Sequence, residues 1–93
     1  MYSIGTTPSK IQQQLANRHK TLRKQQGFTQ SDLAERSGVS LGSLKRFEQT
    51  GQISLEALLK LLHVLNRLEE FDKLLMPEPD MAAIEALFSD DMK

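Results

Sequence analysis

The 93-residue chain contains no cysteine, no tryptophan, three prolines and five glycines, and aromatic residues make up only 5% of it. The lack of cysteine excludes disulfides, thiolate zinc sites and thiol catalysis. No apolar run approaches the ~18–20 residues that a membrane-spanning helix needs, and the N-terminus lacks the charged-then-apolar pattern of a signal peptide. We therefore expect a cytoplasmic protein that makes no use of a membrane.

Clusters of reactive side chains are scarce as well. The two histidines, His19 and His63, stand far apart in the sequence, and no carboxylate cluster accompanies either one. Catalysis or metal binding would need several converging groups, so we expect no enzyme activity, no metal site and no cofactor. His19 is expected to be a semi-buried packing residue, or else a pH-sensitive position, and His63 a surface residue.

The zero net charge hides an asymmetry between the two halves of the chain. Residues 1–52 contain eight Lys and Arg against three Asp and Glu (+5), and residues 53–93 contain four against nine (−5). A basic half joined to an acidic half indicates an anionic partner on one side only. The alternative is a chance segregation of charges on solvated faces.

Apolar residues recur with helical spacing, and alternating strand-like patterns are almost absent. The pattern predicts five short helices. Four of them begin at the capping residues Thr7, Thr29, Ser40 and Ser54, and the fifth begins at about Leu68. The expected extents are residues 8–26, 29–38, 41–49, 55–65 and 68–76. We expect Ile11 and Leu55 on the apolar stripes of the first and fourth helices, and Leu75 on that of the fifth.

The chain thus divides into a flexible arm (1–8), one all-α domain (9–76) and an acidic tail (77–93) with a short amphipathic segment. A helix of about eight residues is marginal by itself, so this segment docks on its own domain, pairs with a second copy or binds a different partner. The candidate dimer or partner surface consists of Leu59, Phe71, Leu74, Ile84, Leu87 and Phe88.

Residues 30–47, QSDLAERSGVSLGSLKRF, have the pattern of two short helices that cross steeply at a tight turn. Ala34 is small where the helices cross, Gly38 supplies the positive φ of the turn, and Leu44 and Phe47 anchor the second helix. The outward residues are then Leu41, Gly42, Ser43, Lys45 and Arg46. This face carries two cations and no acid, and such a helix can enter the DNA major groove. A plain α-hairpin in a bundle is the alternative.

The strings GFTQSDLAERSGVS and SLKRFE resemble the helix-turn-helix of the Cro/CI (XRE) family of repressors, and the resemblance spans about residues 10–76. It implies a compact five-helix, lambda-repressor-like domain that binds double-stranded DNA. Because one short recognition helix touches few bases, we expect a homodimer on a near-palindromic operator.

The resemblance also implies roles for individual residues. Leu41, Gly42 and Arg46 match base-contacting positions, with Lys45 and Ser43 nearby, and Gln30 matches a phosphate-binding position. Arg23 and Glu48 match a pair that forms an internal ion bridge, with the arginine near the DNA backbone. Family members often have long polar residues where this chain has Leu41 and Gly42, which shifts base readout onto Arg46 and Lys45.

Other candidates for phosphate contact are weaker. Lys24 and Lys45 are either phosphate contacts or solvated charges, and Ser40 is first a helix cap, with Ser43 the better candidate of the two serines. His19 stands where the family usually has an aliphatic residue.

A narrower resemblance concerns RFEQTGQISLEALLKLLHVLNRLEEFDKLL, which is similar to HipB-like antitoxins encoded beside HipA-like kinase toxins. In that family the small protein represses its own operon and associates with the toxin. It implies an autoregulating antitoxin and repressor. The alternatives are an interaction protein that mainly neutralises a toxin, and a stand-alone phage-type repressor.

Overall fold

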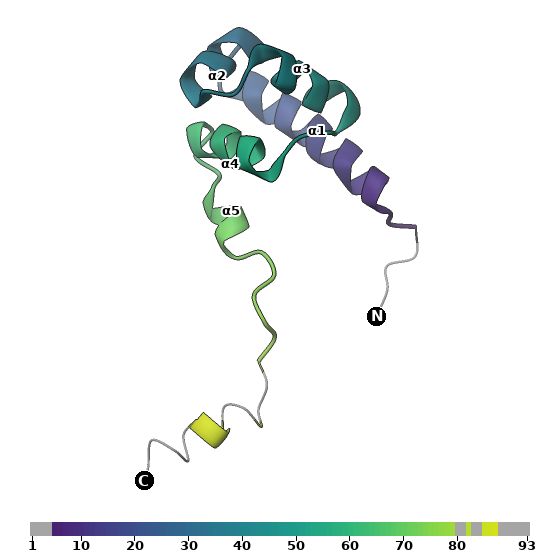
Figure 1. Cartoon of the computed structure of the whole chain (residues 1–93), viewed down its shortest axis with the longest axis vertical. Coiled ribbons are helices and arrows are strands. Elements are labelled where there is room, and N and C mark those ends of the chain that lie inside the picture. The colour runs from purple at the N-terminus through teal and green to yellow at the C-terminus, as the bar shows by residue number, and fades with distance from the viewer. Residues whose placement is uncertain (1–4, 80–81, 83–84, 88–93) are drawn as a thin grey trace.

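The computed structural model describes residues 5–79, 82 and 85–87, and all regular elements in these ranges are helices (Figure 1). In chain order they are α1 (Pro8–Gln25), α2 (Gln30–Ser37), α3 (Leu41–Thr50), α4 (Leu55–Val64) and α5 (Glu69–Asp72). Residues 82 and 85–87 are also helical. α1 packs against α3, and α2 packs against both α3 and α4. The all-α fold expected from the sequence is confirmed.

Each of the four longer helices begins after a hydroxyl side chain that accepts a hydrogen bond from a backbone N–H three residues on. These capping residues are Thr7, Thr29, Ser40 and Ser54. At α2 the carboxylate of Asp32 also accepts a hydrogen bond from the Thr29 backbone N–H, which completes a capping box. The starts expected for these helices are confirmed. They could be predicted from the sequence because a cap depends only on a few neighbouring residues.

Two glycines with left-handed backbone conformation end α2 and α3. Gly38 has a φ of 78° and Gly51 a φ of 80°, and both amides donate to the last turn of their helix. Gly51 has a second constraint, since a Cβ placed there would lie 2.9 Å from the backbone of Gln12. The end of α3 therefore touches the first half of α1, whereas the sequence indicated only a loop at this point.

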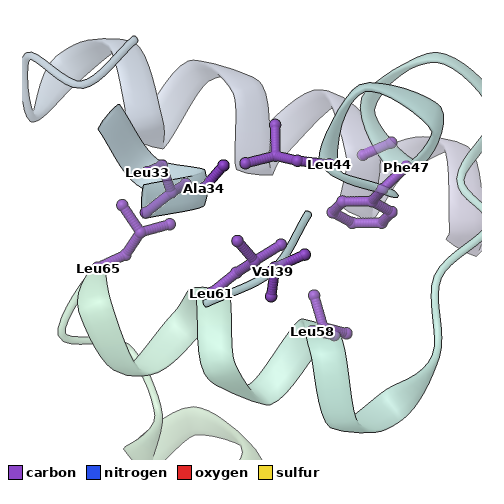
Figure 2. Close-up of a cluster of buried hydrophobic side chains, with 9 residues drawn as sticks. Leu33, Ala34, Val39, Leu44, Phe47, Leu58, Leu61 and Leu65 are labelled. Carbon is purple, nitrogen blue, oxygen red and sulfur yellow. The ribbon is translucent and has the colours of Figure 1, made fainter. Parts of the chain in front are cut away.

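The core lies where α2, α3 and α4 converge on α1. Figure 2 shows the side chains of Leu33 and Ala34 on α2, Val39 in the turn, Leu44 and Phe47 on α3, Leu58 and Leu61 on α4, and Leu65 directly after α4. The largest of these, Phe47, is almost fully buried. Burying a side chain of this kind stabilises a fold by about 1.5–3 kcal/mol, so these contacts fix the angle between α2 and α3.

The fifth helix is shorter than the sequence predicts. We expected helix over residues 68–76, but α5 covers only Glu69–Asp72 and has no side-chain cap. Leu75, expected on an apolar face, has a φ of 63° and is 91% exposed. A short helix gains too little to extend when its next apolar residues stay uncovered, and Leu74, Leu75 and Met76 after α5 are exposed.

Two further residues expected on apolar stripes are exposed, and the physical reason is the same for both. Ile11 lies in the first turn of α1 and Leu55 is the first residue of α4, so both lie at helix ends away from the convergence point. No helix within the described ranges is long and apolar enough to cross a membrane.

Candidate nucleic-acid interface

The exposed side of α3 carries four of the five residues expected there. Gly42, Ser43, Lys45 and Arg46 are exposed. Leu41 is an exception to the outward orientation predicted for it: it is half-buried and packs against the core cluster. It lies at the first position of α3, directly after the turn, where an apolar side chain can cover the edge of the core.

The one acidic residue of α3 faces inward. Glu48 is 8% exposed, and the guanidinium of Arg23 on α1 holds it by two hydrogen bonds, Nε to Oε2 at 2.8 Å and Nη2 to Oε1 at 2.9 Å. Arg23 also donates from Nη1 to the backbone oxygen of Phe28. The ion bridge expected between Arg23 and Glu48 is present, and the exposed face of α3 keeps only positive charge.

Arg23 was also a candidate for DNA phosphate contact. Its side chain is buried at 6% exposure, and its Nε, Nη1 and Nη2 atoms all donate to protein acceptors. This geometry gives Arg23 a structural role in joining α1, α3 and the loop before α2.

Gln30, at the start of α2, belongs to the same network. Its amide Nε2 donates to Glu48 Oε1 at 3.0 Å, and its side chain is half-buried. Glu48 therefore holds a candidate phosphate-binding side chain in place as well as neutralising Arg23.

His19 completes the network, and here the sequence interpretation needs correction. No carboxylate stands near it in the sequence, yet Nδ1 lies 2.9 Å from Glu48 Oε2, across 29 residues. His19 is 4% exposed, so it is buried rather than semi-buried, and its ring meets Phe47 edge-on at a centroid distance of 5.1 Å. His63, in contrast, is exposed as expected.

The surroundings lower the pKa of both His19 and Glu48. Burial lowers the pKa of His19 below its ordinary value of 6.5 and outweighs the attraction of Glu48, which raises it, while Arg23 adds to the lowering. Burial raises the pKa of Glu48, but hydrogen bonds from Arg23 and Gln30 and the positive charge of Arg23 outweigh it, and the net pKa lies below 4.5. At neutral pH the network therefore consists of a carboxylate, a guanidinium and a neutral imidazole.

Arg46 has a partner that sequence reasoning missed. Its Nη2 donates to Gln52 Oε1 at 2.6 Å, just beyond the end of α3. Thr50 braces the same corner, because its hydroxyl donates to the Arg46 backbone oxygen and accepts from the Gln52 backbone N–H. The sequence offered one signal, a polar side chain directly after the Thr50-Gly51 turn. The contact orients the guanidinium at the C-terminal end of α3.

The remaining phosphate candidates fall into two groups. Ser40 and Ser43 lie together at the start of α3, where Ser40 Oγ donates to Ser43 Oγ at 2.8 Å and accepts from the Ser43 backbone N–H. Lys24 is an exposed residue of the last turn of α1, apart from these serines. No group of three or more potential metal ligands gathers within the part of the chain that the structure describes.

The candidate partner surface is only partly assembled in the described ranges. Leu59 and Phe71 are half-buried and line a groove with Leu68, whereas Leu74 and Leu87 are exposed. Ile84 and Phe88 lie outside the described residues. Leu75 and Met76 were not among the candidates, but both are exposed beside Leu74. We call the exposed run Leu74, Leu75 and Met76 the C-terminal apolar patch.

Comparison with known proteins is consistent with this geometry. A family model described as helix-turn-helix matches residues 20–71, a range that runs from the second half of α1 to α5. Neither the curated proteins nor the solved structures contain a significant match to the chain.

Proposed function

Because the chain belongs to the helix-turn-helix family of the Cro/CI (XRE) type, whose members are DNA-binding transcription regulators, we propose that it is a sequence-specific repressor that binds its operator as a homodimer. The observation that carries this proposal is the exposed face of α3. It presents Lys45 and Arg46, while its one acid, Glu48, is turned inward and paired with Arg23. Such a helix approaches the acceptor-rich edge of guanine without repulsion.

In this proposal α3 enters the major groove and Arg46 reads a base. A guanidinium can donate two parallel hydrogen bonds to guanine O6 and N7, and Gln52 already orients it. Lys45 lies beside it as a second reader. Gly42 has open space around it, so the backbone of α3 can approach the major groove closely. Leu41 is half-buried, and only the exposed part of its side chain contacts a thymine methyl group.

Phosphate contacts position the protein in this proposal and carry no sequence information. Gln30 braces the start of α2 on one strand, and Ser43, Ser40 and Lys24 supply further donors around α3 and the end of α1. Arg23 contributes to phosphate binding indirectly. It keeps Glu48 ionised, and Glu48 in turn holds the side chain of Gln30 in place.

A second copy explains the C-terminal apolar patch. An exposed run of large apolar side chains marks an interaction surface in a chain of this size. Pairing two copies through it presents two α3 helices, and we expect the two half-sites one helical turn apart, about 34–36 Å.

The test is fluorescence anisotropy with the DNA directly upstream of this protein's own gene, against a scrambled duplex of equal length, at several salt concentrations. We expect a preference of about 10³-fold or more, with log Kd rising linearly with log salt concentration. Equal, weak binding to both duplexes would refute specific autoregulation.

The finer proposal is that the repressor is the antitoxin of a HipBA-like operon. The specific observation in its favour is the acidic tail that follows the C-terminal apolar patch, because this tail can hold a HipA-like kinase toxin while the patch pairs two copies. A pull-down with the product of the neighbouring gene tests it. Binding that is lost on deletion of residues 78–93, with DNA binding kept, supports the antitoxin role. No binding by the full chain leaves a stand-alone repressor.

A further inference from the structure

A groove of about 450 Å³ lies between α1, α4 and α5, on the side of α1 that does not face α3. Its walls are mainly apolar and include Leu15 and Leu22 of α1, Leu58 and Leu62 of α4, and Phe71 of α5. This volume falls within the range of small-molecule sites, which are typically apolar with a few fixed polar groups.

His19 lines this groove and is 4% exposed. The other polar residues of the lining are exposed, namely Asn17, Arg18, Thr21, Gln25, Arg67 and Glu70. The Nδ1 of His19 pairs with Glu48, but its Nε2 is buried and has no hydrogen-bond partner within the described residues. Buried polar atoms of folded proteins nearly always have a partner, so an orphan atom of this kind needs an explanation.

The hydrogen-bonding role of Nε2 follows from its neighbours. Glu48 is bound by Arg23 through two hydrogen bonds, and this keeps the carboxylate ionised, so that it only accepts. Nδ1 must therefore carry the hydrogen that it shares with Glu48. Burial lowers the pKa of His19, so the ring is neutral and Nε2 is left with a lone pair.

The position of Nε2 also follows. The two ring nitrogens of imidazole point in roughly opposite directions, and Nδ1 points at Glu48 on α3. Nε2 is thus directed away from Glu48, and the groove is lined by residues of α1, α4, α5 and the segment between the last two, with none from α3.

We propose that this groove binds a small, mainly apolar molecule that carries one hydrogen-bond donor, of the class of the simple phenols, with the donor bonded to His19 Nε2. The apolar walls take the ring of such a molecule, and the lone pair selects a donor over a methyl group of equal size. The site is distinct from the α3 face, and its test needs no DNA.

The probes are 4-methylphenol and 1,4-dimethylbenzene, which have nearly the same shape and differ in the hydroxyl. The full chain is labelled with ¹⁵N in its histidines, and the ring nitrogens are followed while each probe is titrated. We expect 4-methylphenol to shift the Nε2 resonance of His19 and to bind about tenfold more tightly than 1,4-dimethylbenzene, as one hydrogen bond provides. His63 is exposed on α4 and serves as the internal control, with an unchanged resonance.

The variant His19→Leu removes the acceptor and keeps an apolar side chain of similar size, so both probes should then bind with equal affinity, detected through the methyl resonances of the groove leucines. If this variant does not fold, Leu62→Trp serves instead, since it fills the groove and should abolish the Nε2 shift while His19 remains.

Three results would overturn the proposal. Equal affinity of the two probes for the unchanged chain would mean that Nε2 does not select the ligand. No shift of His19 at saturating 4-methylphenol would mean that nothing reaches Nε2. A change of the groove resonances with protein concentration alone, and none with 4-methylphenol, would show that a second copy of the chain covers the groove.

Discussion

At the scale of single residues, Gln52 holds the guanidinium of Arg46 on the exposed face of α3. In the proposed complex this guanidinium bonds one guanine. Arg46→Ala should then cost about 1–3 kcal/mol of binding free energy on the operator and relax specificity at one base pair, as measured by anisotropy on single-substitution duplexes.

Lys60→Ala is the matched control for Arg46→Ala, since it removes one exposed cation from α4, where an exposed pair with Glu56 contributes little. We expect it to leave base preference unchanged. If Arg46→Ala weakened binding to all sequences equally and lowered the salt slope by about one, Arg46 would be a phosphate contact.

Glu48 joins α1, α2 and α3 through three side chains, namely Arg23, His19 and Gln30. Removing one partner of a buried charge network leaves the others unpaired, so Glu48→Ala should lower the free energy of unfolding by about 3–5 kcal/mol in urea denaturation. Glu35→Ala, which changes an exposed acid of α2, should stay within about 0.5 kcal/mol. A loss below about 1 kcal/mol for Glu48→Ala would contradict this role.

The same network predicts a pH dependence of stability. The pKa of His19 is lowered on folding, so below pH 6.5 the unfolded chain binds more protons than the folded chain, and the free energy of unfolding falls as the pH falls. The lowered pKa of Glu48 acts in the same direction, starting near pH 4.5.

Urea denaturation at pH 7.5, 6.0 and 5.0 measures this effect. We expect a progressive loss of stability with acid in the unchanged chain, and His19→Leu should remove the part that sets in near pH 6.5. Stability that is constant from pH 7.5 to 5.0 would contradict the lowered pKa of His19.

At the scale of elements, Gly42 within α3 and Gly51 at its end should respond to an alanine substitution with opposite changes in stability. Gly51 needs its left-handed conformation and leaves no room for a Cβ against the backbone of Gln12. Gly51→Ala should therefore cost at least about 2 kcal/mol of unfolding free energy. Gly42 has a helical conformation and open space, so Gly42→Ala should stabilise the helix by about 0.5–1 kcal/mol. Thermal unfolding of both variants distinguishes these roles, and equal effects would refute them.

The length of α5 is also decided at the scale of elements. Its residues are compatible with a longer helix, and the spacing of Phe71 and Leu75 favoured one. Only Phe71 finds a neighbour in the core cluster, and Leu75 is left exposed. Periodicity predicts which face of a helix is apolar, but a short helix forms only where that face is covered.

At the scale of the whole molecule, the C-terminal apolar patch predicts self-association. Placing two charges in it by the double change Leu74→Glu and Leu75→Glu should convert a dimer into a monomer in sedimentation equilibrium at micromolar concentration. Leu55→Glu is the control, because Leu55 is exposed at the N-terminal end of α4 and lies outside the patch. An unchanged chain that is strictly monomeric, with and without DNA, would refute the two-fold model.

Much of this molecule was predictable because the deciding signals are local. The caps Thr7, Thr29, Ser40 and Ser54 set where helices begin, Gly38 sets the turn of the helix-turn-helix, and the spacing of Leu44 and Phe47 sets which side of α3 faces the core. Each of these effects acts within a few residues, so the sequence determines it directly.

The tertiary structure decided the features that join distant segments. Glu48 meets His19 across 29 residues and Arg23 across 25, and the resemblance to a family indicated only the second of these pairs. The same holds for the contact of Gly51 with Gln12, for the groove beside His19 and for the length of α5. These features depend on how three helices cross, which fixes which buried polar atoms meet, and no spacing along the chain encodes that geometry by itself.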